Sequence, residues 1–299
     1  GDIDVVLKRS TDNGKTWQKM QVIAEDGINR CCNPTPVVLG NGKIILVYSW
    51  NHDSTPDDHT IYTIESDDDG VTWQNKKDIT PQIQRGGESR YLPGPCHGIV
   101  KEKDPHKGRI IIPHRGKSNS KTPVHVICSD DNGKTWFHGG NVNYSGGNEC
   151  TVAEFSDGAL LIDMRNTDSN DYFRWQAISE DGGNSWKNAY QTVLIEQQSG
   201  CQGSLHRFKW DEKTGKAILL FSNPTHTSSR RHGAVKLSLD EGMTWPKMYM
   251  FTSKTGDDMY CSYSDLVTMS TEVIGVAYEA GYQLGQGILF KTFKYSDIT

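Results

Sequence analysis

Short apolar runs separated by tight polar turns recur along the whole chain, and this pattern predicts strands. In residues 36–48, an apolar strand, a Gly-Asn-Gly turn and a second apolar strand follow one another. Residues 152–164 repeat the same order around a Ser-Asp-Gly turn. Glycine supplies the positive φ that such tight turns require. The chain is therefore expected to be all-β and built from antiparallel hairpins.

A more specific eight-residue pattern punctuates these hairpins: serine, any residue, aspartate, any, glycine, any, threonine or serine, and tryptophan. Serine and aspartate side chains can bond to the nearby backbone, and tryptophan can pack the turn against its own sheet. Nothing in the pattern is chemically reactive, so we interpret it as structural. A period of about 50 to 63 residues is typical of propellers and other repeat architectures. The five copies lie at residues 10–17, 66–73, 129–136, 179–186 and 238–245.

The unit between successive tryptophans is interpreted as a four-stranded antiparallel blade. A final unit shows only three strands, and residues 1–25 look like half a blade, so the ring lacks two opening strands and one closing strand. Because an uncovered sheet edge would be costly, we predict a six-bladed β-propeller. It would form a single domain over residues 1–299. Its first blade would be incomplete, with the N-terminal strands outside this sequence. The expected units are residues 32–75, 91–140, 145–197, 200–250 and 258–294.

Composition narrows the possible functions. The 299 residues carry 30 glycines and 35% hydrophobic residues, as expected for many short strands with alternating faces. A net charge of −5 without a basic run argues against a nucleic-acid partner. No run of about 18 apolar residues exists, so no membrane span is expected. The seven cysteines show neither CxxC nor zinc-finger spacing, so we expect buried thiols and no metal. We also expect no cofactor and a monomer.

Strand direction groups polar residues on one rim of the predicted propeller. If the turns that carry the repeated pattern lie at one end of every blade, the loops between second and third strands must lie at the other end. First strands also begin at that other end. The residues expected around this mouth are Asn33, Trp50, Glu149, Arg165, Arg230, Arg231, Tyr263 and Glu279.

The residue types at this mouth suggest a site for an anionic ligand. The planar fork of arginine binds a carboxylate through two parallel hydrogen bonds. A substrate with a carboxylate at its reacting carbon would repel a carboxylate nucleophile, whereas a phenol activated by a neighbouring base would not be repelled. Tyrosine nucleophiles of this kind occur among glycoside hydrolases. Alone, a rim arginine is usually a solvated charge and a tyrosine usually packing, so the inference depends on their convergence.

The chain resembles the exo-α-sialidases over essentially its whole length. The five repeats look like the Asp boxes of that family. Residues 148–154, 200–204 and 263–266 resemble segments of its mammalian cytosolic and bacterial members. The resemblance implies hydrolysis of terminal sialic acid from glycoconjugates with retention of configuration. Tyr263 would be the nucleophile and Glu149 its general base.

The same resemblance suggests how the substrate would be held. Arg165 looks like the second member of the family's arginine triad, which grips the sialate carboxylate. Arg230 looks like the third member, with Arg231 as the alternative. Glu279 resembles the glutamate that orients the first arginine, and Asn33 resembles a contact near the 4-hydroxyl and N-acetyl groups of the sugar.

Two elements of the family pattern are missing from these residues. The first arginine belongs to a Phe/Tyr-Arg-Ile-Pro segment that does not occur here. The general acid is an aspartate that would fall before residue 1, and strand alignment places neither Asp2 nor Asp4 at its position. We interpret the sequence as a fragment of a longer enzyme, impaired by the lack of general acid catalysis, typically worth about 10² to 10⁴-fold.

Other functions remain open at this stage. A trans-sialidase would share every residue named above. A non-catalytic sialic-acid-binding propeller would fit the missing acid, and a structural or protein-binding Asp-box propeller would fit the repeats alone. The expected partners are sialylated glycans or glycoconjugates. The compartment is not determined by the sequence, although a secreted, periplasmic or cell-surface location is favoured over a cytoplasmic one.

Overall fold

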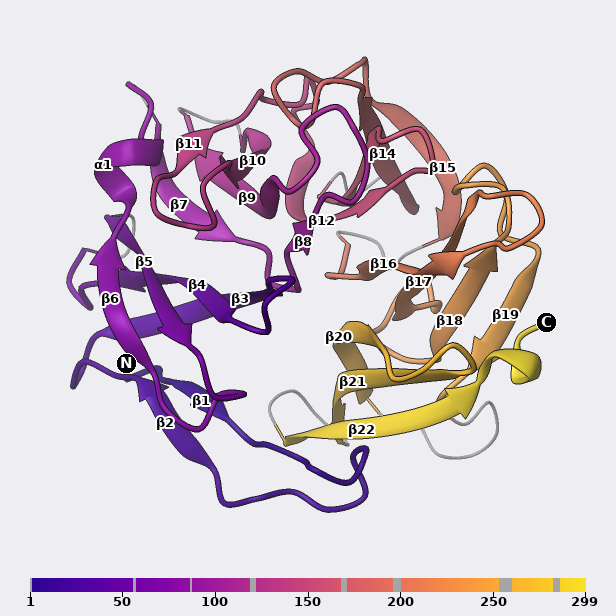
Figure 1. The fold of residues 1–299 in the computed structure, drawn as a ribbon, viewed down its shortest axis with the longest axis horizontal. Helices are drawn as coiled ribbons and strands as arrows, with labels where there is room; N and C mark the ends of the chain where they lie inside the picture. Colours follow the sequence, from indigo (N-terminus) through magenta and orange to yellow (C-terminus); the bar gives the residue numbers. More distant parts are fainter. Residues whose placement is uncertain are drawn as a thin grey trace.

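The regular secondary structure of the chain is almost entirely antiparallel sheet, and the sheets are arranged around a central axis (Figure 1). This computed structural model describes residues 2–55, 58–86, 88–118, 122–167, 171–195, 200–252, 260–281 and 286–299. Helix in these residues is limited to one turn, α1 (Thr80–Ile83), and the 3₁₀ turn η1 (Tyr295–Asp297). The expected all-β propeller is confirmed, with five blades of antiparallel sheet.

The first two sheets follow the chain order. A two-stranded sheet contains β1 (Val5–Leu7) and β2 (Gln21–Ala24). The next, four-stranded sheet contains β3 (Arg30–Val38), β4 (Ile44–Asn51), β5 (His59–Ser66) and β6 (Gln74–Asp78).

The remaining four sheets follow around the axis. One contains β7 (Ser89–Pro93), β8 (Ile99–Val100), β9 (Ile110–Lys117), β10 (Val124–Ser129) and β11 (Phe137–His138). The next contains β12 (Gly147–Glu154), β13 (Leu160–Asn166), β14 (Phe173–Ser179) and β15 (Tyr190–Ile195). Then come β16 (Ser204–Trp210), β17 (Ala217–Pro224), β18 (Gly233–Ser238) and β19 (Lys247–Met250). The final sheet contains β20 (Tyr260–Thr268), β21 (Val273–Gly281) and β22 (Gly287–Lys294).

The blades depart from the expected four strands in one place. Both β7 and β8 pair with β9, so this sheet has five strands. Pro93 ends β7 and Pro95 follows it, and proline has no N–H to give to a ladder, so the expected first strand is divided. The expected unit limits at residues 197 and 258 lie outside the described residues.

Neighbouring sheets pack face to face through continuous apolar clusters. Between the β3–β6 and β7–β11 sheets, the cluster includes the fully buried Ile112. Similar clusters join each following pair of sheets up to β20–β22. The β1–β2 sheet packs on β3–β6 through Val5 and Leu46, and its loop reaches β22 through an edge-to-face contact of Trp17 with Phe290, 5.4 Å between ring centroids.

The repeated eight-residue pattern forms a self-satisfied turn, as the box at residues 129–136 illustrates. The carboxylate of Asp131 accepts hydrogen bonds from the backbone N–H and the hydroxyl of Thr135, at 2.9 and 2.6 Å. Ser129 donates to Asp131 and accepts from the backbone N–H of Gly133, which has a φ of +84°. Trp136 is 3% exposed. The polar groups of the box are used within it, which confirms the structural interpretation.

Strand register places the boxes and the expected mouth at opposite ends of a blade. In the β12–β15 sheet, Leu160 pairs with Ser179, the first residue of a box. At the other end of the same strands, Gly147 pairs with Asn166, next to Arg165. The ends of the strands therefore separate turn-forming residues from candidate site residues, as strand direction predicts.

Two further expectations concern the cysteines and membranes. All seven cysteines are free thiols, and six of them are buried. In the described part of the chain, no helix is long and apolar enough to cross a membrane.

Candidate active site

Three of the expected site residues lie at irregularities in the innermost strands. The register of β3 shifts between Cys32 and Thr35, around Asn33. The register of β12 shifts between Gly147 and Cys150, a gap that includes Glu149. The register of β20 shifts between Cys261 and Ser264, a gap that includes Tyr263. A bulge bends its strand and re-aims a side chain that would otherwise follow the regular alternation. The bulges thus allow residues of the packed inner strands to face the mouth.

Glu149 and Tyr263 come together although 114 positions separate them in the chain. The hydroxyl of Tyr263 donates a short hydrogen bond to Oε1 of Glu149. The guanidinium of Arg165 donates to Oε2 of Glu149 at 2.7 Å and to the hydroxyl oxygen of Tyr263 at 3.2 Å. Glu149 is only 6% exposed, so this carboxylate is held by its two partners away from bulk water.

The surroundings keep the phenol of Tyr263 protonated. Burial raises its pKa, and the charge of Glu149 and the hydrogen bond to it raise the pKa further, whereas Arg165 acts in the opposite direction. The pKa therefore lies far above the ordinary value of about 10. At neutral pH this oxygen can become a nucleophile only by passing its proton to a base as the new bond forms. Glu149 is in position to receive that proton.

A second arginine lies near the ring of the tyrosine. Arg230, in the loop between β17 and β18, donates to the hydroxyl of Ser262 at 2.8 Å and to that of Tyr260 at 3.4 Å. Its guanidinium carbon lies 5.5 Å from the centre of the Tyr263 ring. Of the two adjacent arginines left open by the sequence, Arg230 is the one in these contacts. Two guanidinium groups thus lie near the phenol, and their positive charge makes the site attractive to an anion.

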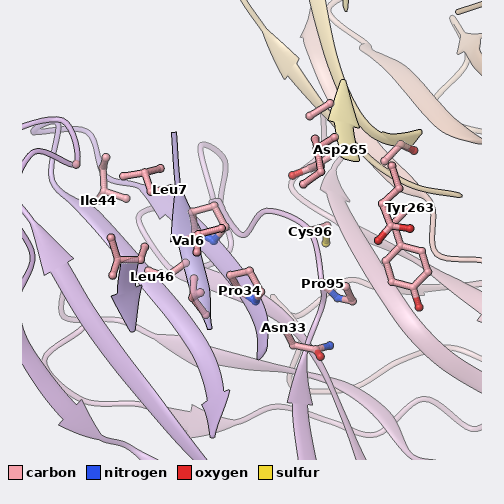
Figure 2. A pocket seen from close by; sticks show the side chains of 18 of the residues that line it. Val6, Leu7, Asn33, Pro34, Ile44, Leu46, Pro95, Cys96, Tyr263 and Asp265 are labelled. Atoms are coloured by element: carbon pink, nitrogen blue, oxygen red, sulfur yellow. The ribbon is translucent and has the colours of Figure 1, made fainter. Parts of the chain in front are cut away.

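A cavity of about 630 Å³ opens beside this cluster (Figure 2). Tyr263, Asn33 and Glu279 line it, whereas Glu149, Arg165 and Arg230 are not part of its wall. Asn33 has a φ of +54° and donates from its amide to the carbonyl of Pro93 at 3.0 Å. Tyr263 is the residue common to the cluster and the cavity.

Glu279 carries an unsatisfied group in this wall. Its Oε2 is buried, and no described residue provides a hydrogen-bond partner for it. A buried carboxylate oxygen without a donor is costly, so the position favours a cationic or hydrogen-bonding neighbour. Glu279 is also the residue that, by the family resemblance, would orient the first arginine of the triad.

Sequence reasoning missed the residues that fix the backbone around Tyr263. The amide of Gln202 donates to the carbonyls of Pro95 and Ser264, both at 3.0 Å, and accepts from the backbone N–H of Ser264 at 2.9 Å. Ser262 holds Arg230 from the neighbouring position of the same strand. Both side chains are neutral. Gln202 lies in the segment 200–204 that the resemblance singles out, whereas Ser262 lies one position before the segment 263–266.

Metal-ligand side chains gather elsewhere in the molecule. Within the described ranges, the one group of three such residues that could share an ion is Glu88, His125 and His138. No residue of the tyrosine–glutamate cluster belongs to it.

Comparisons with known proteins show the family and the fold of the chain. Residues 1–276 match the family described as a BNR repeat-like domain. The chain is 31% identical to a sialidase of Bacteroides fragilis, over 99% of this chain and 57% of that protein. A solved Hadza microbial sialidase matches with a TM-score of 0.87 and 28% identity, over 99% of this chain and 60% of that one. A leech intramolecular trans-sialidase solved with 2,7-anhydro-Neu5Ac shares the fold, with a TM-score of 0.82 and 15% identity, over 99% of this chain and 64% of that one.

The blades and the five boxes define an Asp-box β-propeller, and the polar cluster lies at its mouth. With the family match and the sialidase relatives added, the chain belongs to the exo-α-sialidase family. It spans less than two thirds of the length of the relatives named above.

Proposed function

We propose that this chain carries the catalytic propeller of an exo-α-sialidase that releases terminal sialic acid with retention of configuration. The observation that carries the proposal is the hydrogen bond from the buried phenol of Tyr263 to Glu149, between two arginines. A neutral nucleophile suits a substrate whose reacting carbon bears a carboxylate, because a carboxylate nucleophile would meet like-charge repulsion. Sialylated glycans or glycoconjugates are the proposed substrates.

In the first step, Oη of Tyr263 forms a bond to the anomeric carbon while the bond to the leaving oxygen breaks. The phenol proton passes to Glu149, and a separate acid protonates the leaving oxygen. In the second step, water attacks the same carbon and the bond to Tyr263 breaks. The phenolate then takes its proton back from Glu149, and the acid accepts the proton of the water. Neither step requires a metal or an organic cofactor.

The proposed role of the arginines is to bind and orient the sialate carboxylate. Arg165 contacts the hydroxyl of Tyr263 and Arg230 lies near its ring, so a carboxylate bound by both would lie close to the attacking oxygen. Charge-assisted hydrogen bonds of this kind are roughly twice as strong as neutral ones. Asn33 would contact the sugar substituents from the cavity wall.

The general acid and a further arginine are proposed to come from chain outside residues 1–299. The unpartnered Oε2 of Glu279 supports this proposal, because a guanidinium beside it would satisfy the buried oxygen. Asp4 does not fill the acid's role in this proposal, in keeping with its strand alignment.

We also propose that the complete propeller has six blades, with β1 and β2 as the outer strands of the sixth. Several large apolar side chains line the cavity and are strongly exposed, including Val6 at 47%, Val38 at 61% and Ile288 at 74%. Figure 2 shows Val6 and Leu7 of β1 on the cavity wall. Two inner strands in this space would cover them and pair with the open edge of β1.

The ring closure has its own test. A longer chain that includes the preceding residues is expected to protect the backbone amides of β1 from hydrogen exchange and to raise the free energy of unfolding. Equal exchange rates at β1 in the long and short chains would contradict the six-bladed proposal.

The activity can be tested with a fluorogenic aryl sialoside, because an aryloxide leaves without help from a general acid. Tyr263→Phe should reduce kcat by about a thousandfold or more, since it removes the nucleophile. Tyr62→Phe, at a half-buried tyrosine of β5, is the matched control and should retain activity. Proton NMR should show the α-anomer of sialic acid as the first product.

The outcomes separate the other functions. Equal rates in wild type and Tyr263→Phe would overturn the assignment of the nucleophile. Saturable binding of sialyllactose without turnover of any sialoside would favour a sialic-acid-binding propeller. Transfer of the sialyl group to added lactose in preference to water would favour a trans-sialidase.

A further inference from the structure

A row of imidazoles crosses the β7–β11 sheet, outside the proposed active site. Nδ1 of His114 lies 3.0 Å from Nε2 of His125, and both residues are fully buried. The ring of His125 stacks on that of His138, with centroids 3.8 Å apart. Nε2 of His138 lies 3.4 Å from Oε2 of Glu88, which precedes β7. The sheet thus encloses three imidazoles and a carboxylate.

Four atoms of this row make no hydrogen bond to a described residue: Nε2 of His114, Nδ1 of His125, Nε2 of His138 and Oε2 of Glu88. The last three lie within 4.8 Å of one another, and Nε2 of His138 faces Oε2 of Glu88 at 3.4 Å. One buried polar atom without a hydrogen bond costs about 1 to 3 kcal/mol, so such atoms are few in folded proteins. Three such atoms so close together can share one partner, and a metal cation can accept lone pairs from all three.

In His125, His138 and Glu88, the other polar atom of the side chain already makes a hydrogen bond. Nδ1 of His138 donates to the carbonyl of Gly139 at 2.6 Å, which leaves a lone pair on Nε2. Nε2 of His125 can donate to His114, which leaves a lone pair on Nδ1. Asn141 donates to Oε1 of Glu88 at 3.1 Å, on the side away from Oε2. Metal-binding histidines are typically oriented in this way by the hydrogen bond of their other ring nitrogen.

We propose that His125, His138 and Glu88 form a site for a divalent transition metal, with Zn²⁺ as the best match. Two imidazoles and a carboxylate are a known zinc ligand set with a fourth position left for water. Zinc–ligand bonds of about 2.0 to 2.1 Å at tetrahedral angles place ligand atoms about 3.3 Å apart. The 3.4 Å between His138 and Glu88 agrees with that spacing.

Binding requires one local adjustment. The rings of His125 and His138 lie at 20° to each other, whereas two lone pairs aimed at one ion require the rings to open from this near-parallel stack. Because His138 lies in the outer strand β11 and Glu88 in the segment before β7, the ion would tie the outer edge of the blade to its inner strand. The expected role is therefore structural.

The competing account is a proton in place of the metal. In that account a proton lies between His138 and Glu88, and a neutral His125 donates to the carbonyl of Pro123. The two accounts differ in metal content, which can be measured directly.

The test uses the full 299-residue chain, without an affinity tag that contains histidine, stripped with a chelator and then dialysed against Zn²⁺. Wild type should retain about one zinc per chain by mass spectrometry, and Co²⁺ should give the visible absorption of a low-symmetry N/O site. At a hundredfold excess over Kd, zinc should raise Tm by about 5 °C. Glu88→Gln and His138→Gln should weaken zinc affinity by more than about tenfold.

His52→Gln, at an exposed histidine, is the matched control and should bind zinc as wild type does. Circular dichroism checks that each variant is folded. If wild type retains no more zinc than folded His138→Gln, or if zinc leaves its Tm unchanged, the metal proposal is overturned. None of these measurements depends on the sialidase proposal.

Discussion

Replacing Glu149 by glutamine tests the central contact of the proposed site. The amide has nearly the same shape as the carboxylate, but it cannot accept the phenol proton of Tyr263. It also removes the charge that helps to raise the pKa of the phenol and that pairs with Arg165. The variant should therefore lose the general base while the phenol becomes easier to ionise.

The size of the effect can be obtained in two ways. Loss of general base catalysis typically costs about 10² to 10⁴ in rate, or about 3 to 5 kcal/mol. Independently, a phenol at its ordinary pKa of about 10 is ionised in roughly one molecule in a thousand at pH 7, and the burial that remains in the variant keeps the fraction below that. Both arguments give a decrease in kcat of about a thousandfold or more for Glu149→Gln.

The pH profile distinguishes this reasoning from a general loss of structure. In Glu149→Gln the rate should rise about tenfold per pH unit from pH 6 to pH 9, because the phenolate must now form by loss of a proton to solvent. The assay is hydrolysis of the fluorogenic aryl sialoside by wild type, by the variant and by Glu149→Gln/Tyr263→Phe as the baseline. A variant within threefold of wild type, or one whose rate does not rise with pH above that baseline, would refute the assignment of Glu149.

Two further predictions concern binding and acid stability. Arg230→Lys should raise KM by about 10 to 100-fold with a smaller change in kcat, because lysine lacks the planar fork; Arg165→Lys should lower kcat as well, because Arg165 also bonds Glu149. An unchanged KM for Arg230→Lys would argue against carboxylate binding. In the Asp box, burial alone would raise the pKa of Asp131, but hydrogen bonds from Thr135 outweigh it and lower the pKa from 3.8 to about 2. Its stabilisation should be complete above about pH 4 and be lost as the pH falls towards 2, so urea unfolding should show a smaller acid loss in Asp131→Asn than in wild type.

The sequence predicted the blades because their signals are local. Strand alternation, glycine turns and the eight-residue boxes each depend on residues within a few positions of one another. The division of one inner strand near Pro93 and Pro95 was not expected, although the Pro-Gly-Pro run at residues 93–95 is a local signal that interrupts a strand. The number of blades in the closed ring stays a prediction.

The candidate site was only partly visible in the chain. Residue chemistry and strand direction selected Glu149, Arg165, Arg230 and Tyr263, and the structure brings these four together. The contact itself depends on bulges at Glu149 and Tyr263, which no local pattern announced. Gln202, which anchors the strand around the tyrosine, was missed as a site residue, because a neutral side chain carries no signal of its role.

The sequence by itself determined the strands, the turns and the residue types available at the mouth, since these follow from periodicity and turn chemistry. Only the tertiary structure decided which side chains meet. Tyr263 reaches Glu149 from another sheet, and Glu88 meets His125 and His138 across separate strands of one sheet. Such contacts join residues far apart in the chain, and their geometry is set by how whole sheets pack around the axis.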